Sequence, residues 1–84
     1  MTLPTIHRNG TSREALQEGY RAAYSILGDA LRVLAETAPN GRDYYPQGDA
    51  MLRQAEAEYR ARATAIQHVR DDMLALFEAC EEEG

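Results

Sequence analysis

Two long segments in which apolar residues recur at alternating steps of four and three limit the folds open to this chain. The first segment spans residues 11–37 and the second spans residues 49–82, with neither proline nor glycine inside the second. This spacing places apolar side chains along one side of an α-helix, as in a coiled coil. The sequence therefore predicts an all-α fold: a coiled-coil-like antiparallel hairpin of two helices.

Each predicted helix presents a contact line, which is the row of residues that faces the other helix. The first contact line is Leu16, Tyr20, Ala23, Leu27, Ala30 and Leu34. The second is Leu52, Ala55, Tyr59, Arg62, Ile66, Val69, Met73, Leu76 and Cys80. In an antiparallel pair that turns about the connector, residues whose numbers sum to about 86 come level. We therefore expect the Arg62 guanidinium to stack on the Tyr24 ring, which stabilises the pair by roughly 1 kcal/mol.

The helix ends carry their own signals. Thr11-Ser-Arg-Glu14 has the form of a capping box, so Thr11 is the predicted N-cap of the first helix, and Pro39 stops that helix. Asp49 is the predicted cap of the second helix. The second helix outruns the first at its C-terminal end, and we expect residues 1–10 to cover that end as an extended strap.

A chain of 84 residues forms one domain, and two helices alone cannot enclose a core. The first helix also has a second stripe of apolar and small residues on another side: Gly19, Ala22, Ile26 and Val33. Small residues allow a neighbouring helix to approach closely. We therefore expect a homo-oligomeric helical bundle.

Charge and cysteine content narrow the possible functions. The net charge of −5 argues against a binder of duplex nucleic acid, which must neutralise phosphates. Cys80 is the only cysteine, so we expect a reducing compartment, such as the cytoplasm of a bacterial host cell, and a packing role for the thiol. We expect no membrane association, because no apolar stretch is long enough to span a bilayer.

Catalytic and metal-binding signatures are missing from the sequence. His7 and His68 lie far apart in the chain, and no serine or cysteine stands beside an obvious base. We therefore expect a protein that is not an enzyme and has no cofactor, no metal site and no catalytic residue.

The connector, residues 38–48, contains the least generic side chains. Arg42 suits a phosphate or carboxylate, while Tyr44 and Tyr45 offer flat faces and phenol groups. The plainer interpretation pairs Asp43 with Arg42 and plugs the end of the hairpin with one tyrosine. Two adjacent tyrosines cannot easily both point inward, so we expect one to be displayed as part of a ligand- or partner-binding surface of residues 42–45.

A second candidate site precedes the first helix. His7, Asn9, Thr11 and Ser12 lie where backbone amides and the positive end of the helix dipole could receive an anion. The plainer interpretation, to which we give more weight, is that Thr11 caps its helix, Asn9 forms the preceding turn and His7 is a surface residue.

The pattern His-x-Asn-Gly-Thr-Ser before one helix and Asn-Gly-Arg-Asp-Tyr-Tyr-Pro-Gln-Gly before the next resembles small uncharacterised helical proteins of tailed bacteriophages and prophages. Here the pattern consists of His7, residues 9–12 and residues 40–48. Phage accessory proteins of this size commonly counter host defence. The chain is more broadly similar to phage sponge proteins that sequester cyclic-nucleotide signals, which are oligomeric helical hairpins, although it lacks their motif.

Three hypotheses about function follow from these features. The protein captures a small anionic, nucleotide-like ligand with the N-terminal segment and the connector of neighbouring subunits. Alternatively, it inhibits a host defence protein by docking on it. The third hypothesis is a structural or assembly module of the phage particle. The acidic composition slightly favours docking over ligand capture.

Overall fold

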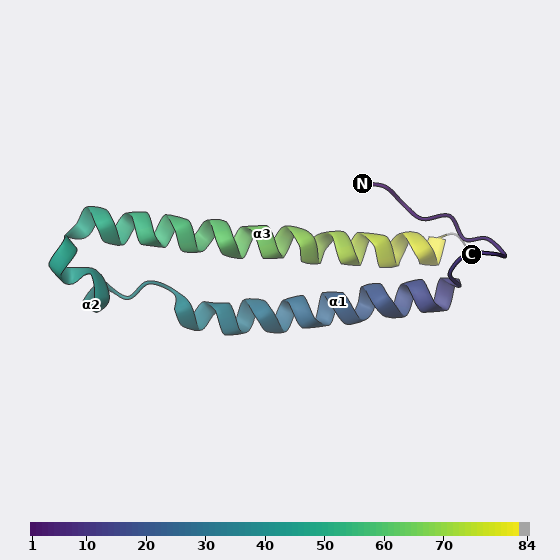
Figure 1. Cartoon of the computed structure of the whole chain (residues 1–84), viewed down its shortest axis with the longest axis horizontal. Helices are drawn as coiled ribbons and strands as arrows, with labels where there is room; N and C mark the ends of the chain where they lie inside the picture. The colour runs from purple at the N-terminus through teal and green to yellow at the C-terminus, as the bar shows by residue number, and fades with distance from the viewer. Residues whose placement is uncertain (83–84) are drawn as a thin grey trace.

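The computed structural model describes residues 1–82, and this part of the chain is mostly helical, without a β-strand (Figure 1). Helix α1 spans Arg13–Leu34 and continues into a 3-10 turn, Ala35–Thr37. A short helix α2, Gly41–Tyr44, is followed by a second 3-10 turn, Tyr45–Gln47, and by the long helix α3, Asp49–Glu82. The molecule is a rod of 61 × 20 × 18 Å. The all-α class predicted from the sequence is confirmed.

Helix α1 begins one residue later than the capping box suggested. Ser12, in extended backbone conformation, is the N-cap, and its hydroxyl accepts a hydrogen bond from the Ala15 amide at 3.1 Å. Thr11 makes no such contact and lies outside the helix. The prediction of Thr11 as the cap is therefore wrong, because the adjacent hydroxyl of Ser12 satisfies the free amide of the first turn.

The connector contains helical turns. The Asn40 side chain accepts a hydrogen bond from the Arg42 amide at 2.9 Å, so it caps α2. Gly48 has a φ of 94°, a conformation that favours glycine, and the chain turns there into α3. The backbone amides of Met51 and Leu52 donate to the Gly48 carbonyl. Asp49 is the first residue of α3. The capping position before the helix, where we expected Asp49, is therefore occupied by Gly48.

The two long helices lie side by side and antiparallel, but α1 covers only the later part of α3 (Figure 1). The connector folds back along the first turns of α3, where Gly41 lies against the Leu52 side chain. The unmatched length of α3 is therefore at its N-terminal end, opposite to our expectation. Leu3 is 53% exposed, whereas Ile6 is half-buried and Cys80 is buried, so cover of this end of α3 by the strap stays a prediction.

The pairing of the long helices differs from the predicted one by about two helical turns. Arg70, not Arg62, lies against Tyr24: its Cζ is 3.8 Å from the ring centroid, and its Nε donates to the Tyr24 carbonyl at 3.0 Å. Arg62 is exposed, and so is Val69 at 47%. The prediction that these two residues belong to the contact line of α3 is therefore wrong.

The core is thin. Within residues 1–82 only Ala55 and Cys80 are buried, and the contact line of α1 is half-buried along its whole length. Ile26 and Val33, from the second stripe of α1, are 64% and 50% exposed. In the described part of the chain, no helix combines the length and apolar content that a membrane span requires.

Candidate functional site

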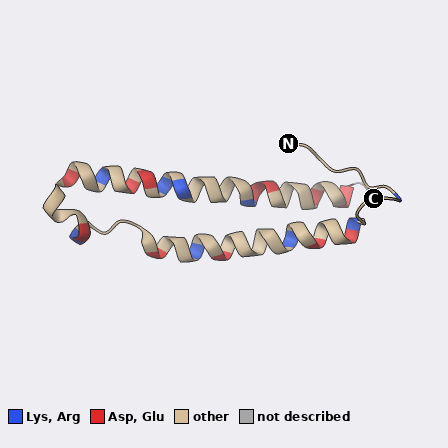
Figure 2. Cartoon of the chain, in the orientation of Figure 1, with Lys and Arg blue, Asp and Glu red and all other residues tan. Residues whose placement is uncertain are grey.

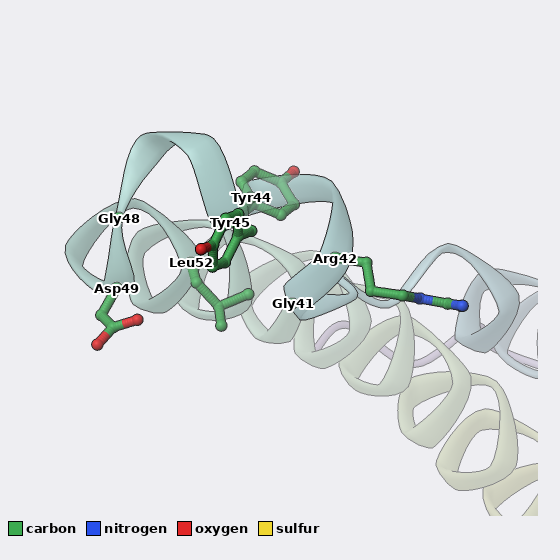
Figure 3. Close-up of a pocket in the computed structure, with 7 residues that line it drawn as sticks. All are labelled: Gly41, Arg42, Tyr44, Tyr45, Gly48, Asp49 and Leu52. Atoms are coloured by element: carbon green, nitrogen blue, oxygen red, sulfur yellow. The ribbon is translucent and has the colours of Figure 1, made fainter.

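The connector and the start of α3 enclose an open hollow of about 510 Å³ (Figure 3). We call it the connector hollow, and its lining residues are Gly41, Arg42, Tyr44, Tyr45, Gly48, Asp49 and Leu52. Leu52, from the first turn of α3, and the two tyrosines give it an apolar lining. The two glycines leave room because they carry no side chain.

The two tyrosines of the connector differ in exposure. Tyr44 is half-buried, whereas Tyr45 is 85% exposed, the most exposed large apolar side chain among the described residues. The expectation that one tyrosine is displayed is met by Tyr45. A displayed tyrosine offers an apolar ring and a hydrogen-bonding hydroxyl at low entropic cost, which suits it to contact a protein partner.

Charged groups stand at two ends of the connector hollow. Figure 3 shows the Arg42 and Asp49 side chains pointing away from the tyrosines in opposite directions. The Arg42 Nε lies 3.3 Å from the Asn40 carboxamide oxygen, to which it donates a hydrogen bond. Asp43 is exposed and forms no ion pair with Arg42, so the plainer interpretation of that pair is wrong. The terminal nitrogens of Arg42 remain available to a carboxylate or phosphate.

The N-terminal candidate residues lie at the opposite end of the rod from the connector (Figure 1). A side chain at Gly10 would meet the His7 ring at 2.6 Å, and the Gly10 amide donates to the His7 carbonyl. His7 therefore packs on its own turn, and the Ser12 hydroxyl is engaged as the helix cap. Asn9 and Thr11 are exposed. Within one chain, this group and the connector do not form a single site.

A second hollow, of about 490 Å³, opens beside the contact between α1 and Arg70. We call it the arginine hollow, and it is lined by Arg21, Tyr24, Ser25, Gly28, Asp29, Leu31, Arg32 and Arg70. Sequence reasoning missed it. Two residues could have indicated it. Arg70 lies four residues after Ile66 and three before Met73, at a spacing that faces the other helix, and Gly28 lies inside a predicted helix.

The ion pair between Arg21 and Glu18 borders the arginine hollow. The Arg21 guanidinium donates two hydrogen bonds to the Glu18 carboxylate, at 2.6 and 3.0 Å. These hydrogen bonds, and then the positive charge of Arg21, hold the pKa of Glu18 below its ordinary value. Both side chains are well exposed, so the pair has little influence on stability.

Elsewhere, charged side chains and potential metal-binding side chains are spread over the molecule. Figure 2 shows acidic and basic residues interspersed along both long helices. Within residues 1–82, no group of three histidine, cysteine, aspartate or glutamate side chains is placed to hold a metal ion. Comparison with protein-family models, with curated proteins and with solved structures gives no match to this chain.

Proposed function

We propose that this chain is a non-enzymatic binding protein that docks on a protein partner through the connector. The observation that carries the proposal is Tyr45, 85% exposed beside the apolar connector hollow. Exposed aromatic residues next to arginine are characteristic of the anchors that dominate binding energy at protein interfaces. A partner side chain can fill the hollow while the Tyr45 ring packs over it.

The backbone around Tyr45 is preorganised, which favours binding. Asn40 caps α2, Gly48 fixes the turn into α3, and Leu52 lies beneath the tyrosines. A surface that is already ordered loses little conformational entropy when a partner binds. The free nitrogens of Arg42 add a contact for a carboxylate of the partner.

We further propose that chains associate through the exposed side of α1. The chain exposes 6171 Å², whereas a compact protein of this length is expected to expose roughly 5,000 Å². The excess of roughly 1,200 Å² is larger than the ~800 Å² that each partner buries in a standard interface. Ile26 and Val33 supply apolar contacts, and a side chain built at Gly19 meets open space, so a second helix can approach there.

The biological setting that we propose is a phage or prophage accessory protein that inhibits a host defence protein in the bacterial cytoplasm. It is supported by the resemblance carried by residues 7–12 and 40–48. In the alternative, the N-terminal segment and the connector capture a ligand together. This requires two chains, because the two segments of one chain lie at opposite ends of the rod. The third alternative, a part of the phage particle, predicts the protein in purified particles.

The test combines Arg42→Ala with Tyr45→Ala. In a bacterium that expresses the protein and carries the relevant defence system, the wild type should restore phage plaques and the double variant should not. Arg60→Ala, which removes an equal charge from an exposed part of α3, is the control and should keep full activity. Helicity by circular dichroism and mass by sedimentation should be unchanged in both variants, since these side chains are exposed. Full activity of the double variant contradicts docking through the connector.

A further inference from the structure

The arginine hollow is lined by three arginines and one aspartate, and one of the arginines, Arg21, is already paired with Glu18. Arg21, Arg32 and Arg70 line it together with Asp29 and the hydroxyl residue Ser25. Neither Arg32 nor Arg70 forms an ion pair within residues 1–82. The hollow is therefore locally positive in a chain whose net charge is −5. An acidic protein that gathers unpaired arginines at one concave place creates a local attraction for anions.

Arg70 is held in place before any ligand arrives. Its guanidinium stacks on the Tyr24 ring at 3.8 Å, and its Nε donates to the Tyr24 carbonyl at 3.0 Å. No other residue of the described chain accepts a hydrogen bond from Arg70, so its two terminal nitrogens stay available. A guanidinium fixed in this way loses little side-chain entropy when it binds an oxyanion.

Gly28 supports the same arrangement. A side chain at Gly28 would lie 2.6 Å from Nη2 of Arg70, so the guanidinium rests directly on the backbone of α1. Glycine weakens a helix interior, and here its absence of a side chain makes room for the arginine. The glycine of α1 and the arginine in the contact line of α3 therefore serve one local structure.

We propose that the arginine hollow binds a small phosphate-bearing ligand. A phosphate group has several acceptor oxygens, which suits a hollow lined by the donors Arg32, Arg70 and Ser25. The hollow is open and, at about 490 Å³, has room for more than one phosphate group, which suits a diphosphate or an organic phosphate. An adjoining apolar hollow of about 110 Å³, lined in part by Leu74 and Phe77, receives the apolar part of an organic phosphate.

This site is independent of the proposed docking function. It contains no connector residue, and it lies on a different side of α1 from the apolar stripe, because each residue rotates the helix by about 100°. Residues 21, 25, 28 and 32 line the hollow, whereas residues 19, 22, 26 and 33 form the stripe. The connector contributes no residue to the hollow, and of the lining residues on α1 Asp29 lies nearest the stripe, about 20° from Ala22 around the helix.

Pyrophosphate is the probe for this site. It is titrated into the full chain at constant ionic strength, and backbone amide signals are followed by NMR. We expect saturable binding, with the largest shifts at Tyr24, Gly28 and Arg32. Arg32→Gln should weaken binding about fivefold or more, the loss expected for a charge-assisted contact. The control, Arg60→Gln, removes the same charge from an exposed position outside the hollow and should change the affinity less than about twofold.

A second variant tests the stacked arginine without changing any charge. Gly28→Ala displaces the Arg70 guanidinium and at the same time favours helix formation, so α1 should stay folded. It should weaken pyrophosphate binding, whereas Gly19→Ala, where a side chain meets open space, should leave binding unchanged. Equal losses for Arg32→Gln and Arg60→Gln, an unchanged affinity for Gly28→Ala, or the absence of saturation would each overturn the proposal.

Discussion

At the scale of single residues, the choice between two arginines decides how the long helices meet. Both Arg62 and Arg70 lie next to apolar positions of α3, and a strict alternation of four and three selects Arg62. In the structure Arg70 takes this role, because it gains both a ring to stack on and a backbone carbonyl that accepts its hydrogen bond. Ala63, the residue after Arg62, is half-buried, whereas Arg62 is exposed.

Arg70→Ala should lower the free energy of unfolding by about 1–2 kcal/mol, since it removes the stacking on Tyr24 and a partly buried hydrogen bond. Arg62→Ala removes the same charge from an exposed position and should change stability by less than about 0.5 kcal/mol. Urea unfolding followed by circular dichroism measures both. A larger loss for Arg62→Ala would contradict the pairing described here.

At the scale of elements, helix ends are determined by which of several neighbouring side chains reaches a free amide. Thr11 and Ser12 are adjacent hydroxyl residues, and both fit a cap by composition. Ser12 has the extended backbone conformation of an N-cap, and its hydroxyl meets the Ala15 amide. The Asn40 side chain performs the same task for α2, so one side-chain cap stands near each end of the rod.

Ser12→Ala should destabilise the protein by about 1 kcal/mol, because the Ala15 amide loses its partner. Thr11→Ala should have an effect of less than about 0.5 kcal/mol, since its side chain makes no capping contact. Thermal unfolding of the two variants at equal protein concentration provides the comparison. A reversed order would restore the assignment of Thr11 as the cap.

The helical elements follow from the sequence more closely than their pairing does. The bounds 49–82 of α3 coincide with the predicted range, because an uninterrupted apolar period specifies a helix locally. The pairing could not be predicted in this way. It depends on the connector, whose helical turns pack along α3 and displace α1 toward the later part of that helix.

The candidate site, too, was predictable within one element but not between elements. The display of one connector tyrosine could be foreseen, because two adjacent tyrosines rarely point inward together, but the sequence did not indicate that it would be Tyr45. The connector hollow requires Leu52 to lie beneath the tyrosines, and the arginine hollow requires Tyr24 and Arg70 to meet. Both are contacts between elements, which periodicity along one element does not specify.

At the scale of the whole molecule, the chain is a rod with very little interior. Only Ala55 and Cys80 are buried within residues 1–82, and Ile26 remains 64% exposed. A single chain of this kind removes little apolar surface from water, so its stability should depend on association with other chains.

We expect the wild-type protein to sediment as an oligomer and to show a melting temperature that rises with protein concentration. Ile26→Asp places a charge in the proposed interface and should dissociate or unfold the protein. Ala57→Asp introduces the same charge at an exposed position of α3 and should leave the mass unchanged. A wild type that sediments as a monomer at micromolar concentration would remove the argument for association.

The position of the connector at one end of a rod 61 Å long has a consequence for valency. Two rods that associate in opposite directions carry their connectors at opposite ends, so such a pair bridges two separate partner molecules. Two rods that associate in the same direction bring their connectors together, and a partner with two matching epitopes is then bound with avidity. Effective concentration falls steeply once the spacing of two sites no longer matches that of their targets. The relative direction of the rods therefore decides whether the assembly crosslinks two partner molecules or binds one partner molecule at two sites.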